Sequence, residues 1–278
     1  MSKKYQFDNI IAETLLIPLY MRAIENQRKD PILKDPIAQQ LVDSIEYDYT
    51  LFDNSIKSAV GCVIRGQYFD DAVRKFIASH KDVVVVNIGC GLDTRCQRVC
   101  DDTPNSATFY DVDLPKVMQI RAELIPAPKN NIYLSESILD IEWLDKIRAA
   151  HPSAKFIFTI EGVLMYFPIE QVKDILHNIA TRFVGGEVWF DLCGKFFAGN
   201  GKYKPDSLRK HQAQIVSGID DGNEVEQFEP LLELIEQAIY QNFNPERWQF
   251  LLRILRHAPR LSRKFSSMVG YKIGSNNE

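Results

Sequence analysis

The sequence lacks several features that would place the chain in particular protein classes. It has 33 lysine and arginine residues against 37 aspartate and glutamate residues, a net charge of −4, whereas a nucleic-acid groove needs a basic face. No apolar run approaches the roughly 18 residues that span a bilayer, and the first residues contain no apolar signal core. We therefore expect a cytoplasmic protein with no nucleic-acid partner and no membrane partner.

Cysteine and histidine are few and poorly arranged for binding a metal. The five cysteines form no CxxC pair, and no histidine lies near Cys90, Cys96 and Cys100 in the sequence, although structural zinc sites need closely spaced ligands. An odd number of cysteines in a chain of 278 residues indicates reduced thiols. We expect no metal site.

The chain does have enough apolar sequence for a large core, at 45% hydrophobic residues, and a regular alternation of predicted elements. Between about residues 82 and 193, short β-branched or aromatic runs alternate with helical segments. This alternation is typical of a parallel sheet with right-handed crossovers, as in a Rossmann-like α/β core. The predicted strands are 83–86, 108–113, 132–134, 155–160 and 187–192, with a closing strand at 268–273.

We predict one domain in three parts. Residues 1–80 form a helical segment packed on the core, 81–193 form the Rossmann-like core, and 194–278 form a lid insertion and closing elements. Helices are predicted at 58–79 (one or two), 115–124, 143–150, 169–182, 224–240 and 245–257. Pro115 marks the start of its helix, because proline suits the first helical turn, and Asp30-Pro31 and Asp35-Pro36 indicate turns or helix starts.

The junction after the valine-rich strand is the most informative feature. Gly89 and Gly91 allow a tight turn and a close approach of the backbone to a ligand, and open α/β sheets bind ligands at this edge. Asp113 follows at about the spacing of the acidic residue that holds a ribose in such folds. Thr94 stands where a dinucleotide-binding loop usually has its third glycine, which weakens an NAD interpretation.

Three blocks of this sequence resemble one family. They are NIGCGLDTR at 87–95, FYDVDLP at 109–115 and EGVLMY at 161–166. Together they are similar to the leucine carboxyl methyltransferase family, which includes bacterial polyketide O-methyltransferases. The resemblance covers about residues 12–193. It implies a class I methyltransferase fold, with a mostly parallel seven-stranded sheet, and S-adenosyl-L-methionine as the cofactor.

The resemblance also implies roles for individual residues. Gly89 and Gly91 would contact the methionine part, Asp113 the ribose, and Ser137 and Ile138 the adenine. Glu161 would bind the ammonium and Arg65 the carboxylate, and Leu114 is also predicted to bind the cofactor. Two acids and one arginine complement a sulfonium cation that carries an ammonium and a carboxylate. Other interpretations remain open: Asp113 as a helix cap, Glu161 as a turn residue and Arg65 as a surface ion pair.

The acceptor side is less defined. We predict Tyr166 and His211 as catalytic residues, and Tyr20, Arg22, Tyr166 and Phe197 as substrate-binding residues. A carboxylate acceptor needs no general base because it is already ionised at neutral pH, whereas a hydroxyl acceptor favours one.

The predicted function is O-methylation, by in-line displacement, of a carboxylate or hydroxyl on a small metabolite such as a polyketide-like compound. The alternatives are an NAD-dependent oxidoreductase and a non-catalytic S-adenosyl-L-methionine-binding regulatory protein. The expected partner is a small-molecule acceptor, and a homodimer is left open.

Overall fold

A computed structural model describes residues 3–5, 10–100, 107–198, 204–209 and 212–275. Its centre is a seven-stranded sheet with the order β3-β2-β1-β4-β5-β7-β6. The strands are β1 Val83–Ile88, β2 Thr108–Asp113, β3 Asn131–Ser135, β4 Lys155–Ile160, β5 Glu187–Cys193, β6 Leu232–Ala238 and β7 Ser266–Ile273. The first five are parallel, and β7 runs antiparallel to both of its neighbours. The predicted class I methyltransferase sheet is confirmed.

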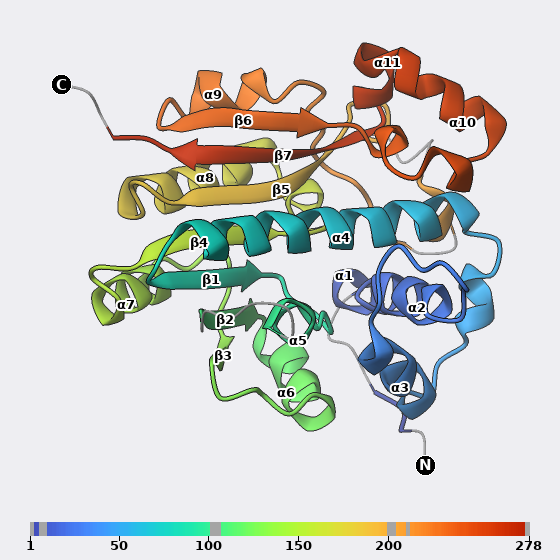
Figure 1. Cartoon of the computed structure of the whole chain (residues 1–278), viewed down its shortest axis with the longest axis horizontal. Coiled ribbons are helices and arrows are strands. Elements are labelled where there is room, and N and C mark those ends of the chain that lie inside the picture. The colour runs from blue at the N-terminus through green and yellow to red at the C-terminus, as the bar shows by residue number, and fades with distance from the viewer. Residues whose placement is uncertain (1–2, 6–9, 101–106, 199–203, 210–211, 276–278) are drawn as a thin grey trace.

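Helices surround this sheet and extend beyond one end of it (Figure 1). The α-helices are α1 Ile10–Glu13, α2 Leu16–Glu25, α3 Pro36–Ser44, α4 Ile56–Ser79, α5 Arg95–Cys100, α6 Pro115–Leu124, α7 Glu142–Ala150, α8 Ile169–Arg182, α9 Asn223–Phe228, α10 Phe250–Ile254 and α11 Pro259–Arg263. Six 3-10 turns complete the elements: η1 Tyr49–Phe52, η2 Leu164–Tyr166, η3 Asp206–Leu208, η4 Tyr240–Asn242, η5 Pro245–Arg247 and η6 Leu255–His257. None of the described helices combines the length and the apolar character that crossing a bilayer requires.

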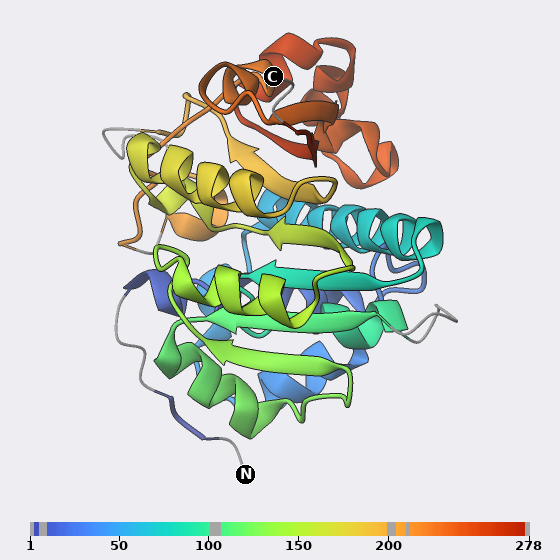
Figure 2. The same ribbon diagram turned by 90° about the vertical axis from the view of Figure 1, so that its left-hand side faces the viewer.

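The central strands are buried on both faces, as the valine run predicts. All six residues of β1 are buried, and successive side chains point to opposite faces. Val83 and Val85 pack with α4 on one face, whereas Val84 and Val86 pack with α7 and α8 on the other. Figure 2 shows α4 and α8 on opposite sides of the strands.

Local signals in the sequence explain where several helices begin. The Asp35 side chain accepts a hydrogen bond from the Ala38 N–H at 3.1 Å and caps α3, with Pro36 as its first residue. Pro115 is likewise the first residue of α6, which has no side-chain cap. The predicted helical segment at 58–79 is one helix of 24 residues, α4.

Two predicted helices in the C-terminal part are wrong. The segment 224–240 folds as the short helix α9 followed by the edge strand β6, which pairs with β7. Its apolar residues have helical spacing, but pairing with β7 and a β-bulge between Leu234 and Glu236 override that local pattern. The segment 245–257 is divided into η5, α10 and η6 rather than one helix.

The parallel strands end at one edge of the sheet, where helices from the first and the last part of the chain lie (Figure 1). Figure 1 shows α1–α3 and α10–α11 at this edge. Within 194–222, the helical structure of the described residues is limited to η3. These segments enclose the space beyond the strand ends.

Candidate active site

A cavity of about 1170 Å³ lies beyond the carboxyl ends of β1, β2, β4 and β5. This is the edge at which open α/β sheets bind ligands. Eleven of the residues predicted from the sequence line it: Arg22, Arg65, Gly89, Gly91, Asp113, Leu114, Ser137, Ile138, Glu161, Tyr166 and Phe197. Tyr20 is not among its lining residues, and His211 lies outside the described residues. The structure thus brings together residues from positions 22 to 197 of the chain.

The turn after β1 has the geometry that its glycines predict. Gly89 and Gly91 have φ angles of 66° and 49°, a region that favours glycine. The Gly89 N–H donates to the Val112 carbonyl at 2.8 Å, which ties the turn to the adjacent strand β2. A Cβ atom on Gly89 would lie 2.3 Å from a methyl carbon of Val163. No larger side chain therefore fits at position 89 without moving Val163.

Asp113 ends β2 and faces the cavity from beside this turn. Its carboxylate accepts the Gly91 N–H at 2.8 Å and the Leu114 N–H at 2.7 Å. It does not cap α6, because helix capping uses the N–H groups of the first turn rather than that of Leu114. Burial raises the pKa of the Asp113 carboxyl, and the two N–H donors oppose that rise. The carboxylate is fixed in direction and available at the cavity wall.

Glu161 directly follows β4 and lies between two arginines. Arg65 donates from Nε to Glu161 Oε1 at 3.0 Å, and Arg95 donates from Nη2 to Glu161 Oε2 at 2.5 Å. Burial favours the neutral acid, but the two guanidinium groups outweigh it and hold the pKa of Glu161 below its usual value. Arg65 is no surface ion pair, since its side chain is only 14% exposed.

Asp191 is a residue of the site that the sequence reasoning missed. It accepts Arg65 Nη1 at 2.9 Å and the Gly162 N–H at 2.6 Å. Burial raises the pKa of its carboxyl, and Arg65 opposes that rise. The available signal was an acidic residue near the carboxyl end of the predicted strand β5, which places it at the same edge as Glu161.

Behind Glu161 lies a buried network of charges that joins the N-terminal helices to the turn. Arg95 donates to Asp70 at 2.9 Å, and Arg98 donates to Asp70 at 2.6 Å and to Asp93 at 2.6 Å. Arg22 belongs to this network: its Nε donates to Asp35 at 2.8 Å and its Nη2 to the Leu92 carbonyl at 3.0 Å. That Arg22 binds substrate stays a prediction: Arg22 lines the cavity, and two of its donors are engaged within the protein.

The prediction that Tyr20 lies at the acceptor site is corrected, since Tyr20 is not among the residues that line the cavity. Its hydroxyl donates to Asp53 at 3.1 Å, and its ring stacks on Tyr49 with the centroids 5.1 Å apart. An aromatic cluster that also includes Tyr47 and Phe52 holds it outside the cavity. A tyrosine in an amphipathic helix suits either a cavity wall or an aromatic cluster, so the sequence of α2 does not distinguish them. The packing of α2 against η1 places Tyr20 in the cluster.

The same cavity is also lined by residues far from the glycine turn in the sequence, and we call this part of its wall the acceptor chamber. Its walls are mainly apolar and come from η2, the segment after β5 and the C-terminal helices. They include Met165, Tyr166, Phe197, Trp248, Leu252 and Leu255. Burial raises the pKa of Tyr166 to about 12. Lys57, Lys204 and Arg209 also line the cavity, so the chamber combines apolar walls with cationic groups.

The residues present fit S-adenosyl-L-methionine. The turn 87–93, Asp113 and residues 136–139 line one continuous wall, and the wall continues to Arg65 and Glu161. Carboxylates and a guanidinium at its two ends suit a donor with a ribose diol, an ammonium and a carboxylate. The individual contacts remain predictions carried over from the resemblance. Among the described residues, no group of three or more His, Cys, Asp or Glu side chains is arranged to hold a metal ion.

Comparison with known proteins agrees with this geometry. The leucine carboxyl methyltransferase family matches residues 16–180. The tetracenomycin polyketide synthesis O-methyltransferase TcmP of Streptomyces glaucescens is 29% identical over 82% of each chain. The S-adenosyl-L-methionine-dependent methyltransferase dpfgK of Gibberella zeae is 27% identical over 87% of this chain and 88% of its own.

Solved structures show the same fold. A protein of Thermobifida fusca described as a methyltransferase superposes with a TM-score of 0.59 at 14% identity, covering 92% of this chain and 94% of its own. A S-adenosyl-L-methionine-dependent methyltransferase of Anabaena variabilis gives 0.52 at 13% identity, with coverage of 81% and 94%. The family match spans more than half of the sequence. The chain therefore belongs to the leucine carboxyl methyltransferase family, and S-adenosyl-L-methionine is its cofactor.

Proposed function

We propose that this methyltransferase transfers its methyl group to a carboxylate oxygen of an apolar small-molecule acceptor. The observation that carries the proposal is the single cavity in which the cofactor wall and an apolar chamber with cationic groups adjoin. The similarity to an O-methyltransferase of polyketide synthesis supports a polyketide-like acid as the acceptor class.

The charges around the chamber favour an anionic acceptor. Lys57 and Arg209 are exposed and line the cavity, and Lys204 donates to the Ala213 carbonyl at 2.9 Å beside them. Asp206 accepts the backbone N–H groups of Lys57 and Ser58 at 3.0 and 3.1 Å, which holds η3 against the start of α4. Cationic side chains that line a cavity raise the local concentration of an anionic ligand.

The protonation states of the cavity also favour a carboxylate. Burial raises the pKa values of Cys62, Tyr166 and Tyr240, so these groups hold their protons at neutral pH. Glu161 and Asp191 are engaged with Arg65. A carboxylic acid with a pKa near 4 is already ionised and needs no base. His211 remains the predicted base for a hydroxyl acceptor, and its position is outside the described residues.

The chain's contribution to the reaction is orientation. The sulfonium of the cofactor supplies an activated methyl group, and in-line displacement requires the nucleophile near 3 Å from that carbon, opposite the leaving sulfur. Asp113 and Glu161 bind the cofactor from two strand ends on one rigid sheet, while Met165 and Phe197 confine the acceptor from the other side. Fixed geometry of this kind supplies a large share of the acceleration in such a transfer.

The test is methyl transfer from labelled S-adenosyl-L-methionine to matched pairs of aromatic acceptors that differ only in bearing a carboxylate or a hydroxyl. We expect methyl esters from the acids and little or no ether from the phenols. Ethers with no esters would assign the acceptor to the hydroxyl class. Tight cofactor binding with no transfer to either class would favour the regulatory alternative.

A further inference from the structure

The segment between η5 and β7 has two different faces. We call residues 249–264, which contain α10, η6 and α11, the flap. From its inner side, Leu252 and Leu255 line the cavity, with Trp248 and Phe265 at the two ends of the segment. The flap is therefore a wall of the acceptor chamber as well as part of the molecular surface.

The outer side of the flap exposes large apolar side chains. Phe250 and Leu251 are 66% and 78% exposed, the two highest values for large apolar residues in the described part of the chain. Ile254 and Leu261 are 47% and 48% exposed. Three of these four residues lie on α10, and a group of exposed large apolar side chains marks an interaction surface. Side chains with so much exposed area protrude from the surface instead of lining a groove.

The charge of the flap is of one sign. Residues 249–264 contain five arginine and lysine residues and no acidic residue, in a chain whose net charge is −4. Arg253, Arg256, Arg260 and Lys264 are exposed, and only Arg263 has an acidic partner among the described residues, Asp221 at 3.4 Å. The net charge of the whole chain hides this local excess, which explains why composition gave no reason to expect a membrane partner.

The combination of protruding apolar groups and cations selects the kind of partner. A symmetric contact with a second copy would place the same cations against one another, which opposes association. A protein partner would need a cleft that is complementary to the protruding side chains. The headgroup region of a bilayer accepts such apolar side chains without a preformed cleft, and arginines around them pair with anionic lipid. Arg253 lies over the Phe250 ring at 5.8 Å, so cation and apolar group share one surface.

We propose that the flap docks the protein on an anionic membrane surface, and that an amphipathic acceptor passes from the bilayer into the chamber behind it. The second part rests on the proposed function, since it requires an acceptor with an apolar body. The geometry places α10 between the membrane surface and the chamber. Phe250, Leu251 and Ile254 are exposed on the outside, and Leu252 and Leu255 line the cavity.

The experiment is sedimentation of the full chain with vesicles of phosphatidylcholine alone and with vesicles rich in phosphatidylglycerol, at low and high salt. We expect binding to the anionic vesicles only, weakened at high salt by screening. Two double variants test the two features separately: Phe250→Ser with Leu251→Ser, and Arg253→Glu with Arg256→Glu. Each is expected to weaken binding by at least about tenfold.

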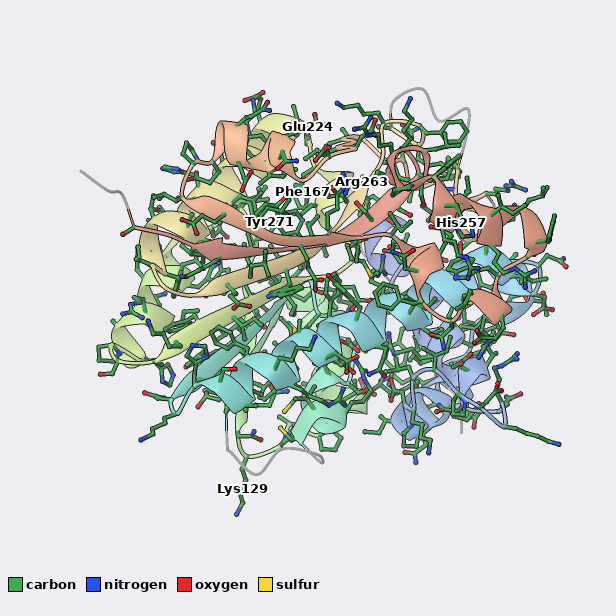
Figure 3. All side chains as sticks on the ribbon, turned by 45° about the horizontal axis from the view of Figure 1, so that its top comes forward. Lys129, Phe167, Glu224, His257, Arg263 and Tyr271 are labelled. Carbon is green, nitrogen blue, oxygen red and sulfur yellow. The ribbon has the colours of Figure 1, made fainter. Side chains whose placement is uncertain are left out.

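Matched controls alter similar residues away from the flap. Val184→Ser changes another exposed apolar residue, 52% exposed, and Lys129→Glu reverses a charge on a loop that Figure 3 shows far from His257 of the flap. Both are expected to bind anionic vesicles as the unmodified chain does. Equal losses in the controls, or no sedimentation with either vesicle, would overturn the proposal. Binding to an acidic protein without binding to vesicles would overturn it as well.

A water-soluble acceptor separates this proposal from the proposed function. The flap variants are expected to methylate such an acceptor at the unmodified rate, and to lose rate only when the acceptor is embedded in anionic vesicles. If the unmodified chain binds vesicles but methylates no carboxylate, the proposed function fails while the docking surface stands. If methyl esters form and vesicles are not bound, the docking surface fails while the proposed function stands.

Discussion

Replacing Arg95 by methionine tests the buried charge network that supports the site. Arg95 is 2% exposed and donates four hydrogen bonds: to Asp70 at 2.9 Å, Asn87 at 3.2 Å, Thr159 at 2.9 Å and Glu161 at 2.5 Å. Methionine keeps much of the length and removes every donor. The variant therefore leaves buried acceptors without their partner.

The expected loss of stability depends on the ion pairs that remain in the variant. Breaking a buried ion pair from one side costs about 3–5 kcal/mol, because a buried charge is left uncompensated. Here Asp70 retains Arg98 at 2.6 Å and Glu161 retains Arg65 at 3.0 Å. The lower end, about 3 kcal/mol, is therefore expected, and at roughly 2–4 °C for each kcal/mol it corresponds to a fall in Tm of about 6–12 °C.

The assay is equilibrium urea unfolding followed by circular dichroism, with thermal unfolding as a second measurement. The matched control is Arg182→Met, because Arg182 pairs with Asp145 at 2.7 Å where the aspartate side chain is 61% exposed. A surface pair of this kind contributes about 0–1 kcal/mol. If Arg95→Met and Arg182→Met lose the same small amount, the buried network does not stabilise this fold as argued.

Three further perturbations address single residues. Asp113→Ala is expected to weaken cofactor binding by about 1–3 kcal/mol, since buried hydroxyls would lose their acceptor; an unchanged Kd in calorimetry would remove Asp113 from the site. Because the pKa of folded Glu161 is lowered from 4.5, its contribution to stability is complete above that unfolded value and is lost as pH falls through the lower folded value. Glu161→Gln should therefore reduce the fall of the urea midpoint with decreasing pH in the acidic range. An unchanged pH dependence of the midpoint would contradict the ion pairing. Asp206→Ala should cost about 0.5–2 kcal/mol, as the loss of a helix cap does; an unchanged urea midpoint would show that the contact of η3 with α4 adds no stability.

The hydrophobic pattern of the sequence predicted the parallel strands because short runs of adjacent residues determine where each strand lies. The valine run of β1 suits a strand buried on both faces, and Pro36 and Pro115 are the first residues of α3 and α6. The same reasoning failed at β6, where the apolar spacing is that of a helix. There the hydrogen bonds offered by β7 outweigh the local preference.

The candidate site divides in the same way. Gly89, Gly91 and Asp113 lie close in sequence or one strand apart, so a local pattern could place them on the cavity wall. Asp191, Tyr240 and Trp248 reach the same cavity from distant parts of the chain, and no spacing relates them to the glycine turn. Tyr20 shows the opposite error, since its helix was expected at the site and its ring packs elsewhere.

The sequence by itself determined the order of strands and helices from β1 to β5, the glycine turn, and the acids at the ends of β2 and β4, because each depends on a few adjacent residues and on the rule that parallel strands end together. Only the tertiary structure decided that Arg65 and Arg95 both hold Glu161, that Tyr20 lies outside the cavity, and that the flap has a cationic, apolar outer face. The physical reason is that ion pairing and burial act between side chains brought together by packing, and their positions along the chain contain no record of that contact.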